Sequence, residues 1–517
     1  MKPDNSIKSN QLKAGVVLSY LHTGIGMLVS LLYTPFVLRV LGQSENGVYQ
    51  TAASVISYLN LLSLGFGSSY MRFFSRYRSK NDEEGIKKLN GLFILVFGLA
   101  AVLSLVAGLV LSSAPTAVFG NKFTAGESAL AQKLLIMMSV GMAITFVDSV
   151  FNMYVTAHER FVFQNVIGIA GTVLNPMLAL PLLLLGYGAS GLTFVAVIVN
   201  AFRLAVDIFY ARRLGMKFSL RSPDISLFKE IAVFSLFILL SSVAGQINST
   251  VDKFLLARYI GSASVSVYDV GAKFNTYLMM FSVTVSNVFI PRVNNYVAEK
   301  RSNVELTELM TRVGRIQFYI MALVFGGFVL VGRYFIGIYA GDGYGQSYSI
   351  ALYLMGASLI PYCQNIGVEI QNAENKHIFR SVAYLVIALC NIAVSIPLIR
   401  SMGISGAALG SALALIVGNV IIMNIYYKKG IGLDMNSFWR SLLRPIASAV
   451  IAFVPCFTLA HFWRVDRMGR FITVGAMYVV LFAASAWFIG ADNYERHLVF
   501  GVFQKIDVKR KRVRNEE

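Results

Sequence analysis

Long apolar runs recur along nearly the whole chain, and no other feature of the sequence limits the fold as strongly. Each run has roughly 18 to 25 residues, which as a helix is long enough to cross a hydrocarbon core of about 30 Å. We therefore predict an all-α, polytopic membrane protein with about fourteen transmembrane helices. The predicted spans are 14–38, 46–69, 89–112, 133–156, 161–185, 191–210, 230–257, 264–290, 316–339, 347–371, 379–399, 406–427, 445–462 and 471–490.

The composition supports this class of protein. Of the 517 residues, 56% are hydrophobic and 14% are charged, and the mean hydropathy is +0.64. The first thirteen residues are polar, and the apolar run that follows is long enough to be retained as a span. All three cysteines, Cys363, Cys390 and Cys456, fall inside predicted spans, so neither a disulfide framework nor a metal site is indicated, and we expect no cofactor.

The net charge of +19 has an uneven distribution that predicts the topology. About 33 of the 45 Lys and Arg residues lie at the termini and on alternate loops, and the opposite loops hold about nine. By the positive-inside rule both termini face the cytoplasm. The basic tail is best explained as a segment at the membrane surface, and we expect no nucleic-acid partner.

A segment near the N-terminus is repeated in the second half of the chain. Residues 35–49 read PFVLRVLGQSENGVY and residues 254–268 read FLLARYIGSASVSVY, so Arg39, Gly42 and Tyr49 recur 219 positions later as Arg258, Gly261 and Tyr268. Further matches follow at offsets of 215 or 216, such as GYGASGL at 186–192 and SMGISGA at 401–407. Equivalent spans are six crossings apart, so the two halves have the same orientation in the membrane, as in a parallel repeat.

The repeat predicts two parallel six-helix lobes followed by two C-terminal helices. The predicted segments are a cytoplasmic N-terminus (1–13), an N-lobe (14–210), a cytoplasmic linker (211–229), a C-lobe (230–427), helices 13 and 14 (428–490) and a basic cytoplasmic tail (491–517). The basic loop at 291–315 carries Val304, Leu309, Met310 and Val313 on one face of a helix that we expect to lie on the membrane surface.

The motif P-x-x-x-R-x-L-G-x(4)-G-x-Y, carried here by Pro35, Arg39, Leu41, Gly42, Gly47 and Tyr49, resembles the start of bacterial oligosaccharide and polysaccharide flippases. Together with the plan of six, six and two helices, the resemblance covers the whole chain. That family lies in the superfamily of multidrug, oligosaccharidyl-lipid and polysaccharide exporters. The resemblance implies two bundles around a central cavity that opens alternately to either side, and a polyprenyl-pyrophosphate-linked sugar as substrate.

Charged residues within predicted spans are the main site candidates, because burying charge in a membrane is costly. Asp252, Lys253, Asp269 and Lys273 lie on the seventh and eighth spans, which the resemblance places at the cavity. The two lysines are candidates to bind the pyrophosphate, although each can instead neutralise a neighbouring Asp; Asp269 and Lys273, four residues apart, share a helix face. The positions that correspond to Lys253 and Lys273 in the first half of the chain are Thr34 and Ser54, so the positive charge belongs to one lobe only.

Other candidates have structural alternatives that we keep open. Arg39 and Arg258 are expected to cap helix ends beside the turns at Gly42 and Gly261, or to contact substrate. Arg203 and Asp207 are expected to form a structural pair. The remaining candidates are Asn60 and His22 for substrate binding or helix–helix hydrogen bonds, Asp148 and Glu369 for a coupling ion, and Arg72 and Arg292 for a cytoplasmic entrance.

The sequence contains none of the motifs G-x(4)-G-K-[ST], H-E-x-x-H or G-x-S-x-G, and we expect a transporter rather than an enzyme. The predicted function is flipping of a lipid-linked oligosaccharide across the bacterial cytoplasmic membrane for cell-surface polysaccharide biosynthesis. A polysaccharide polymerase or other biosynthesis proteins are possible partners. The alternatives are a multidrug cation exporter, a lipid II flippase and a non-transporting scaffold for polysaccharide synthesis.

Overall fold

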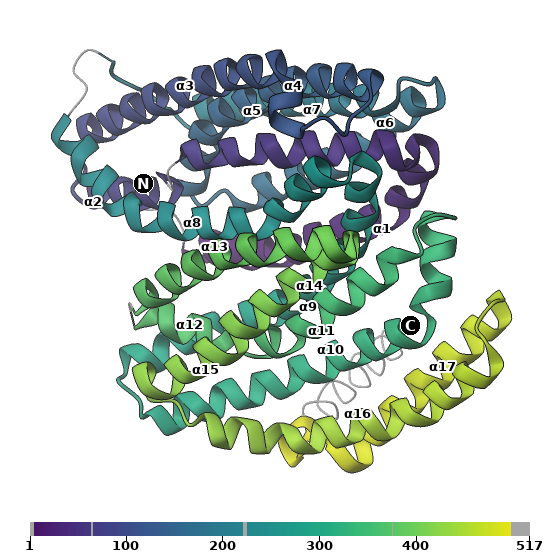
Figure 1. Ribbon diagram of the computed structural model, residues 1–517. Coiled ribbons are helices and arrows are strands. Elements are labelled where there is room, and N and C mark those ends of the chain that lie inside the picture. The colour runs from purple at the N-terminus through teal and green to yellow at the C-terminus, as the bar shows by residue number, and fades with distance from the viewer. Residues whose placement is uncertain (1–4, 64–65, 221–224, 375, 498–517) are drawn as a thin grey trace, which may run out of the picture. The chain divides into compact units, whose positions relative to one another are not determined.

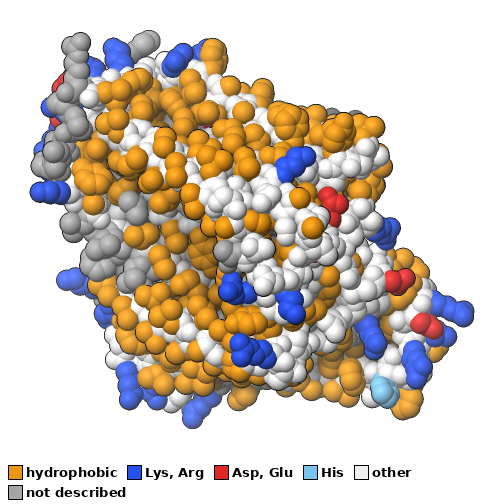
Figure 2. Space-filling view, turned by 45° about the horizontal axis from the view of Figure 1, so that its top comes forward, with side chains coloured by type: hydrophobic (Ala, Val, Ile, Leu, Met, Phe, Trp, Pro, Cys, Tyr) orange, Lys and Arg blue, Asp and Glu red, His pale blue; other side chains and the backbone are white. Residues whose placement is uncertain are grey.

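Every regular element in the described part of the chain is a helix (Figure 1). The computed structural model describes residues 5–497, apart from 64–65, 221–224 and 375. Among these residues, ten helical segments are long and apolar enough to cross a membrane. This confirms the predicted all-α polytopic class, while the count of fourteen spans remains a prediction. Hydrophobic side chains cover much of the face seen in Figure 2, as expected for a surface in contact with hydrocarbon.

Contacts divide the chain into two compact units, each described here by itself. Unit 1 comprises Met1–Val270 and Ser381–Ser411, and unit 2 comprises Gly271–Arg380 and Ala412–Glu517. The division falls within two helices, α9 (Ser262–Ala298) and α14 (Ile404–Leu415), and near the start of α13 (His377–Met402). The units follow spatial contacts and do not coincide with the lobes predicted from the repeat, which stay a prediction.

Unit 1 packs long helices around two apolar cores. Besides parts of α9, α13 and α14, this unit contains α1 (Asn5–Ser57), α2 (Phe66–Ser79), α3 (Glu83–Ser113), α4 (Pro115–Phe119), α5 (Ala125–Ala157), α6 (Phe161–Leu184), α7 (Gly188–Arg213) and α8 (Ile225–Tyr259), with a 3₁₀ turn at Tyr58–Ser63. Helix α5 begins with a capping box, in which Thr124 and Glu127 satisfy free N–H groups of the first turn. The aromatic core of α2, α3 and α5 includes Tyr70, whose hydroxyl donates to Asn90 Oδ1 at 2.6 Å.

Helix α1 contains the first duplicated turn. Gly42 has φ 69° and ψ −177° inside α1, which divides this helix into a first part that contains the predicted span 14–38 and a second part that covers only the beginning of the predicted span 46–69. Gly261 has φ 130° between α8 and α9. The predicted role of both glycines as permissive turn residues is confirmed, since L-residues rarely adopt these angles.

The second part of α1 meets the start of α9 at very close range. A Cβ atom added to Gly47 would lie 1.8 Å from the carbonyl oxygen of Ser262. Beside it, the buried Asn46 donates from Nδ2 to Ser266 Oγ at 2.7 Å. Glycine is therefore required at position 47 because the two backbones touch there.

Unit 2 is built mainly on α10 (Asn303–Ala340) and on the pair α16 (Met435–Trp463) and α17 (Met468–Ser485), which lie side by side in Figure 1. The other elements are α11 (Gln346–Cys363), α12 (Asn365–Ala373), α15 (Met423–Tyr426) and the π-helical turns Ile416–Ile422, Tyr427–Ile431 and Ala486–Gly490. The predicted span 347–371 is divided between α11 and α12. Pro361 lacks the N–H that would continue the helix, and α11 ends two residues later.

The surface helix that we expected in the loop at 291–315 does not exist as a separate element from residue 303 onward. Its residues form the first turns of α10, which continues without a break into the predicted span 316–339. Leu309, Met310 and Val313 are buried inside unit 2, and only Val304 is exposed. The expectation was wrong because the apolar face of this helix packs against the protein rather than against the membrane.

Candidate functional site

An ion pair joins α8 to α9 in unit 1. Lys253 Nζ donates to Asp269 Oδ1, and the two side chains are 17% and 5% exposed. The sequence placed Asp269 within reach of Lys273 on its own helix, and the structure adds a partner from the neighbouring helix. Such a pair provides a half-buried cation that is held in one position by a carboxylate. Lys273 itself is half-buried on α9 and belongs to unit 2.

Asp252, the residue directly before Lys253, lies in a buried hydrogen-bond network. Its Oδ2 accepts from the hydroxyl of Tyr268 at 2.5 Å and from the hydroxyl of Ser411. Ser411 in turn accepts from Asn391 Nδ2 at 3.1 Å. The other carboxyl oxygen, Oδ1, is buried and has no hydrogen-bond partner among the described residues. A carboxylate buried in this way needs a proton or a cation to offset its charge.

Tyr268 is the tyrosine of the duplicated segment, and the sequence gave no indication of its contact with Asp252. Tyr49, the corresponding residue in the first copy, lines a pocket instead. This pocket in unit 1 has a volume of about 340 Å³ and includes the polar side chains of Ser57, Asn60, Thr145, Thr193 and Asn200. Asn60 is exposed there, and Gln246 Nε2 donates to Ser57 Oγ at 2.5 Å. The pocket has the hydroxyl and amide groups that sugars bind, which agrees with the candidacy of Asn60.

The two duplicated arginines lie at the helix ends where the sequence placed them. Arg39 is exposed on α1 three residues before Gly42, and Arg258 is exposed next to the end of α8. A Cβ atom on Gly120 would lie 3.2 Å from the carbonyl oxygen of Arg258 and 3.3 Å from its side chain, so the stem of Arg258 packs closely against another turn of unit 1. This contact supports a structural role for Arg258.

Asp148 belongs to a buried cluster on α5 and α7. Arg203 Nε lies 3.4 Å from Asp148 Oδ2 and 3.7 Å from Asp207 Oδ2. The predicted pair of Arg203 and Asp207 is confirmed, and the sequence missed that Asp148 shares the same guanidinium, because this contact joins residues 55 positions apart. One cation faces two buried carboxylates, so the cluster has capacity for a further proton or cation. Glu369 is half-buried on the short helix α12 of unit 2.

His22 forms a hydrogen bond between helices. Its Nε2 lies 3.2 Å from Thr172 Oγ1 on α6, and the ring fills the space beside Gly168, where a Cβ would come within 2.5 Å of it. Of the two roles considered for His22, the structure provides the contact that the structural role requires.

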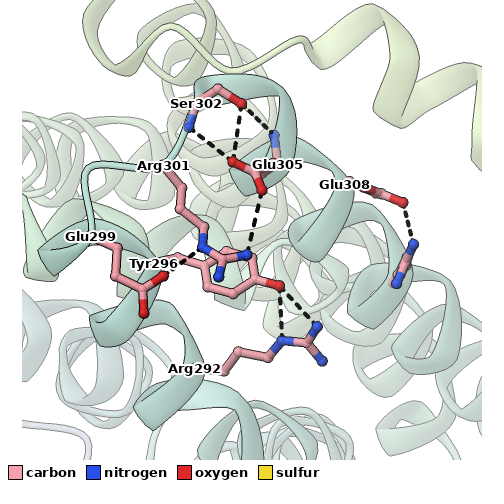
Figure 3. Close-up of polar contacts among 8 residues, drawn as sticks. Arg292, Tyr296, Glu299, Arg301, Ser302, Glu305 and Glu308 are labelled. Atoms are coloured by element: carbon pink, nitrogen blue, oxygen red, sulfur yellow. Dashed lines mark hydrogen bonds and ion pairs between the residues drawn. The ribbon is translucent and has the colours of Figure 1, made fainter.

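The two proposed entrance arginines are both exposed. Arg72 lies on α2 in unit 1. Arg292 lies near the end of α9 in unit 2 and donates to the hydroxyl of Tyr296 from Nε at 3.2 Å and from Nη2 at 2.9 Å (Figure 3). Arg301 lies over the same tyrosine ring and pairs with Glu299 at 2.7 Å, so charged groups at this turn are largely engaged with one another. No group of three metal-binding side chains occurs in the searched, described part of the chain.

The fold is that of a polytopic helical membrane protein, and it is similar to the folds of solved transporters. A solved structure titled lipid II flippase MurJ, in an inward closed conformation, aligns with 94% of this chain and 99% of that chain, with a TM-score of 0.72 and 15% identity. A solved structure of the MATE multidrug transporter DinF-BH aligns with 81% of this chain and 95% of that chain, with a TM-score of 0.60 and 18% identity.

Sequence comparison identifies the family. The polysaccharide biosynthesis protein family matches residues 12–297, more than half of the chain, and the chain belongs to that family. A Bacillus subtilis (strain 168) relative, described as the uncharacterized membrane protein EpsK, is 21% identical over 93% of this chain and 96% of its own length. A Haloferax volcanii relative, described as the probable low-salt glycan biosynthesis flippase Agl15, is 21% identical over 39% of this chain and 43% of its own length. The one of these two relatives that is named by function is described as a probable flippase, in agreement with the prediction of a non-enzymatic protein.

Proposed function

We propose that this protein is a flippase that moves polyprenyl-pyrophosphate-linked oligosaccharide repeat units from the inner to the outer leaflet by alternating access. The observation that carries this proposal is the family match over residues 12–297. Two comparisons support it: a relative described as a glycan biosynthesis flippase, and a shared fold with a lipid II flippase along almost the whole chain. The product would serve cell-surface polysaccharide biosynthesis.

The pyrophosphate carries at least two negative charges and needs cationic groups along its path. Lys253, held by Asp269, is the best-defined cation of the candidate site, and Lys273 on α9 is the second. The lysine ammonium is a compact charge with three donors, which suits the many acceptor oxygens of a pyrophosphate. Asn60 and the other polar groups of the pocket in unit 1 would bind sugar hydroxyls.

The same framework offers two places for a coupling ion. The cluster of Asp148, Arg203 and Asp207 contains one carboxylate more than it has arginines, and Glu369 lies on α12. Exchange of a proton or a sodium ion at the cluster would change the net charge of a buried site, and such a change provides a driving force for a conformational switch. Removal of the product on the outer side, for example by a polymerase, would provide an alternative driving force.

The proposed location is the bacterial cytoplasmic membrane, with both termini in the cytoplasm. This orientation rests on the distribution of Lys and Arg in the sequence. It places Arg72 and Arg292 at the cytoplasmic mouth, where they would attract an anionic head group. Enzymes that synthesise and polymerise the repeat unit would be the functional neighbours.

The first experiment measures lipid extracts of cells depleted of the protein by mass spectrometry. We expect a complete oligosaccharide repeat unit to accumulate on its polyprenyl-pyrophosphate carrier, and the mass of that unit identifies the sugar. Re-expression of the native chain should remove the intermediate, and Lys273→Ala should not, even when the variant is folded and abundant. If Lys273→Ala restores normal lipids, this lysine does not bind the pyrophosphate.

Two alternatives of the same fold have distinct outcomes in this experiment. A lipid II flippase, favoured by the TM-score of 0.72, predicts that the accumulating lipid is the peptidoglycan precursor. A multidrug exporter, favoured by the TM-score of 0.60, predicts no lipid intermediate and a new sensitivity to cationic drugs. A scaffold without transport activity predicts that Lys273→Ala has no effect so long as protein complexes remain intact.

A further inference from the structure

A second, larger pocket lies in unit 2, apart from all the candidate residues above. It has a volume of about 1050 Å³ and lies between the first turns of α10, the first turns of α16 and residues 492–494. The Lys and Arg distribution predicts that this end of α16 is cytoplasmic. The lining includes four arginines, Arg312, Arg315, Arg440 and Arg444, and we refer to it as the arginine pocket.

Two of the four arginines are already neutralised. Arg315 is buried and makes a bidentate contact with Glu495. Arg312 pairs with Glu308, four residues earlier on α10. The other acidic residues of the lining are Asp492, whose Oδ2 lies 3.5 Å from Arg315 Nε, and Asp434, which accepts from the backbone N–H groups of Asn436 and Ser437 at the start of α16. The acidic groups of the lining therefore have structural partners of their own.

The other two arginines have no such partner. Arg440 and Arg444 are exposed, four residues apart on α16, and neither forms an ion pair or hydrogen bond with any residue that the structure describes. Thr311 Oγ1, also on the lining, is buried and has no hydrogen-bond partner within the described ranges. Two guanidinium groups and a free hydroxyl that face one pocket are the groups that bind a phosphate.

The surface of α16 beyond these arginines is apolar. At 100° per residue, Arg440 and Arg444 share one face of α16 with Ala447, Ile451 and Val454, and all five residues are exposed. The distance along the axis from Arg444 to Val454 is about 15 Å at a rise of about 1.5 Å per residue. One continuous face thus combines a cationic end with an apolar stretch, which matches the head group and acyl chain of a lipid.

We propose that the arginine pocket binds the phosphate head group of an anionic phospholipid, with Arg440 and Arg444 as its cationic contacts and the exposed face of α16 beneath the acyl chain. Positive-inside anchoring alone requires only scattered cations, whereas here two uncompensated arginines share a pocket with an unsatisfied hydroxyl. A lipid bound there would contact both α10 and α16 and stabilise unit 2. This inference concerns a resident lipid and is independent of the transported substrate.

The test uses the purified full-length protein and measures its thermal unfolding as phosphatidylglycerol is added, with phosphatidylcholine and inorganic phosphate in parallel. We expect phosphatidylglycerol to raise the unfolding temperature, and the double variant Arg440→Gln/Arg444→Gln to need at least tenfold more of this lipid for half the effect. Arg440→Lys/Arg444→Lys keeps both charges and should retain more of the effect than the Gln variant. Native mass spectrometry counts the bound lipid independently of stability.

The matched control removes two arginines elsewhere. Arg212→Gln/Arg213→Gln lies at the end of α7 in unit 1, on two exposed side chains, and should leave the response to phosphatidylglycerol unchanged. An equal loss in both double variants would overturn the proposal in favour of general surface electrostatics. Equal protection by phosphatidylcholine, or by inorganic phosphate alone, would also overturn it, because the site would then not select an anionic lipid.

Discussion

Replacing Arg315 by alanine should destabilise unit 2 severely. The guanidinium donates to both carboxylate oxygens of Glu495 at 2.7 and 2.8 Å, to the carbonyl of Ser441 at 2.6 Å and to the carbonyl of Gly490 at 2.9 Å. Arg315 is 6% exposed and Glu495 is 9% exposed. Arg315→Ala thus leaves a buried carboxylate without its cation, together with two carbonyl groups that lose a donor.

The expected loss of unfolding free energy is roughly 3 to 5 kcal/mol, the usual cost of removing one partner of a buried ion pair. For a unit of roughly 200 residues, about 2–4 °C per kcal/mol converts this to a fall in melting temperature of roughly 6 to 20 °C. The control is Arg76→Ala in unit 1, which removes an ion pair to Glu230 with both side chains 55% exposed. That surface pair should contribute less than about 1 kcal/mol.

The chain has its own reporters for this measurement. Cys363 and Cys456 are buried in unit 2, so a thiol-reactive fluorescent dye reaches them when the unit unfolds. Cys390 is exposed, and Cys390→Ser removes its background signal. If Arg315→Ala lowers the melting temperature no more than Arg76→Ala does, the argument that this buried network stabilises unit 2 is refuted.

Three further predictions concern unit 1. Lys253→Ala should lower the melting temperature because it removes the ammonium that donates to Asp269 Oδ1, and Lys253→Ala/Asp269→Ala should recover part of that loss when unfolding of the whole chain is followed by circular dichroism; equal melting temperatures of the two variants would contradict the coupling. Burial lowers the pKa of His158 below its usual value of 6.5, so the neutral form is favoured in the folded state. The stability that His158 contributes is therefore present above about pH 6.5 and is lost as the pH falls through the folded-state pKa. His158→Gln should show a smaller fall in melting temperature between about pH 7.5 and 5 than the native chain does, and identical slopes would exclude this contribution. Gly42→Ala should cost roughly 1 to 3 kcal/mol from backbone strain alone, because nothing lies within 4 Å of the added methyl group at φ 69°; a neutral effect on melting temperature would mean that the turn relaxes.

The local features of the fold were predictable because they depend on residues that are close in sequence. Apolar runs of about 20 residues predict helices in a membrane, and a glycine after an arginine predicts the end of a helix, as at Gly42 and Gly261. The pair of Arg203 and Asp207 followed from the helical period in the same way. These predictions needed no knowledge of how helices pack.

The contacts between helices were not predictable from one sequence. Lys253 pairs with Asp269 across 16 residues, and Ser411 bonds Asp252 across 159 residues. Both contacts depend on which faces of α8, α9 and α14 meet, and hydrophobicity does not distinguish those faces when all sides of a helix are apolar. The same limit explains the error at Leu309, Met310 and Val313, where an amphipathic face fits a membrane surface and a protein core equally well.

The close approach of Gly47 to Ser262 limits how alike the two copies of the repeat can become. Gly47 and Ser266 occupy equivalent positions, 219 residues apart, and Ser266 uses its hydroxyl to bond Asn46. A chain made symmetric with serine at both positions would place a Cβ atom at position 47, 1.8 Å from a carbonyl oxygen. A chain made symmetric with glycine at both positions would lose the hydroxyl that bonds Asn46. Where the two copies touch, the contact therefore favours two different residues at equivalent positions.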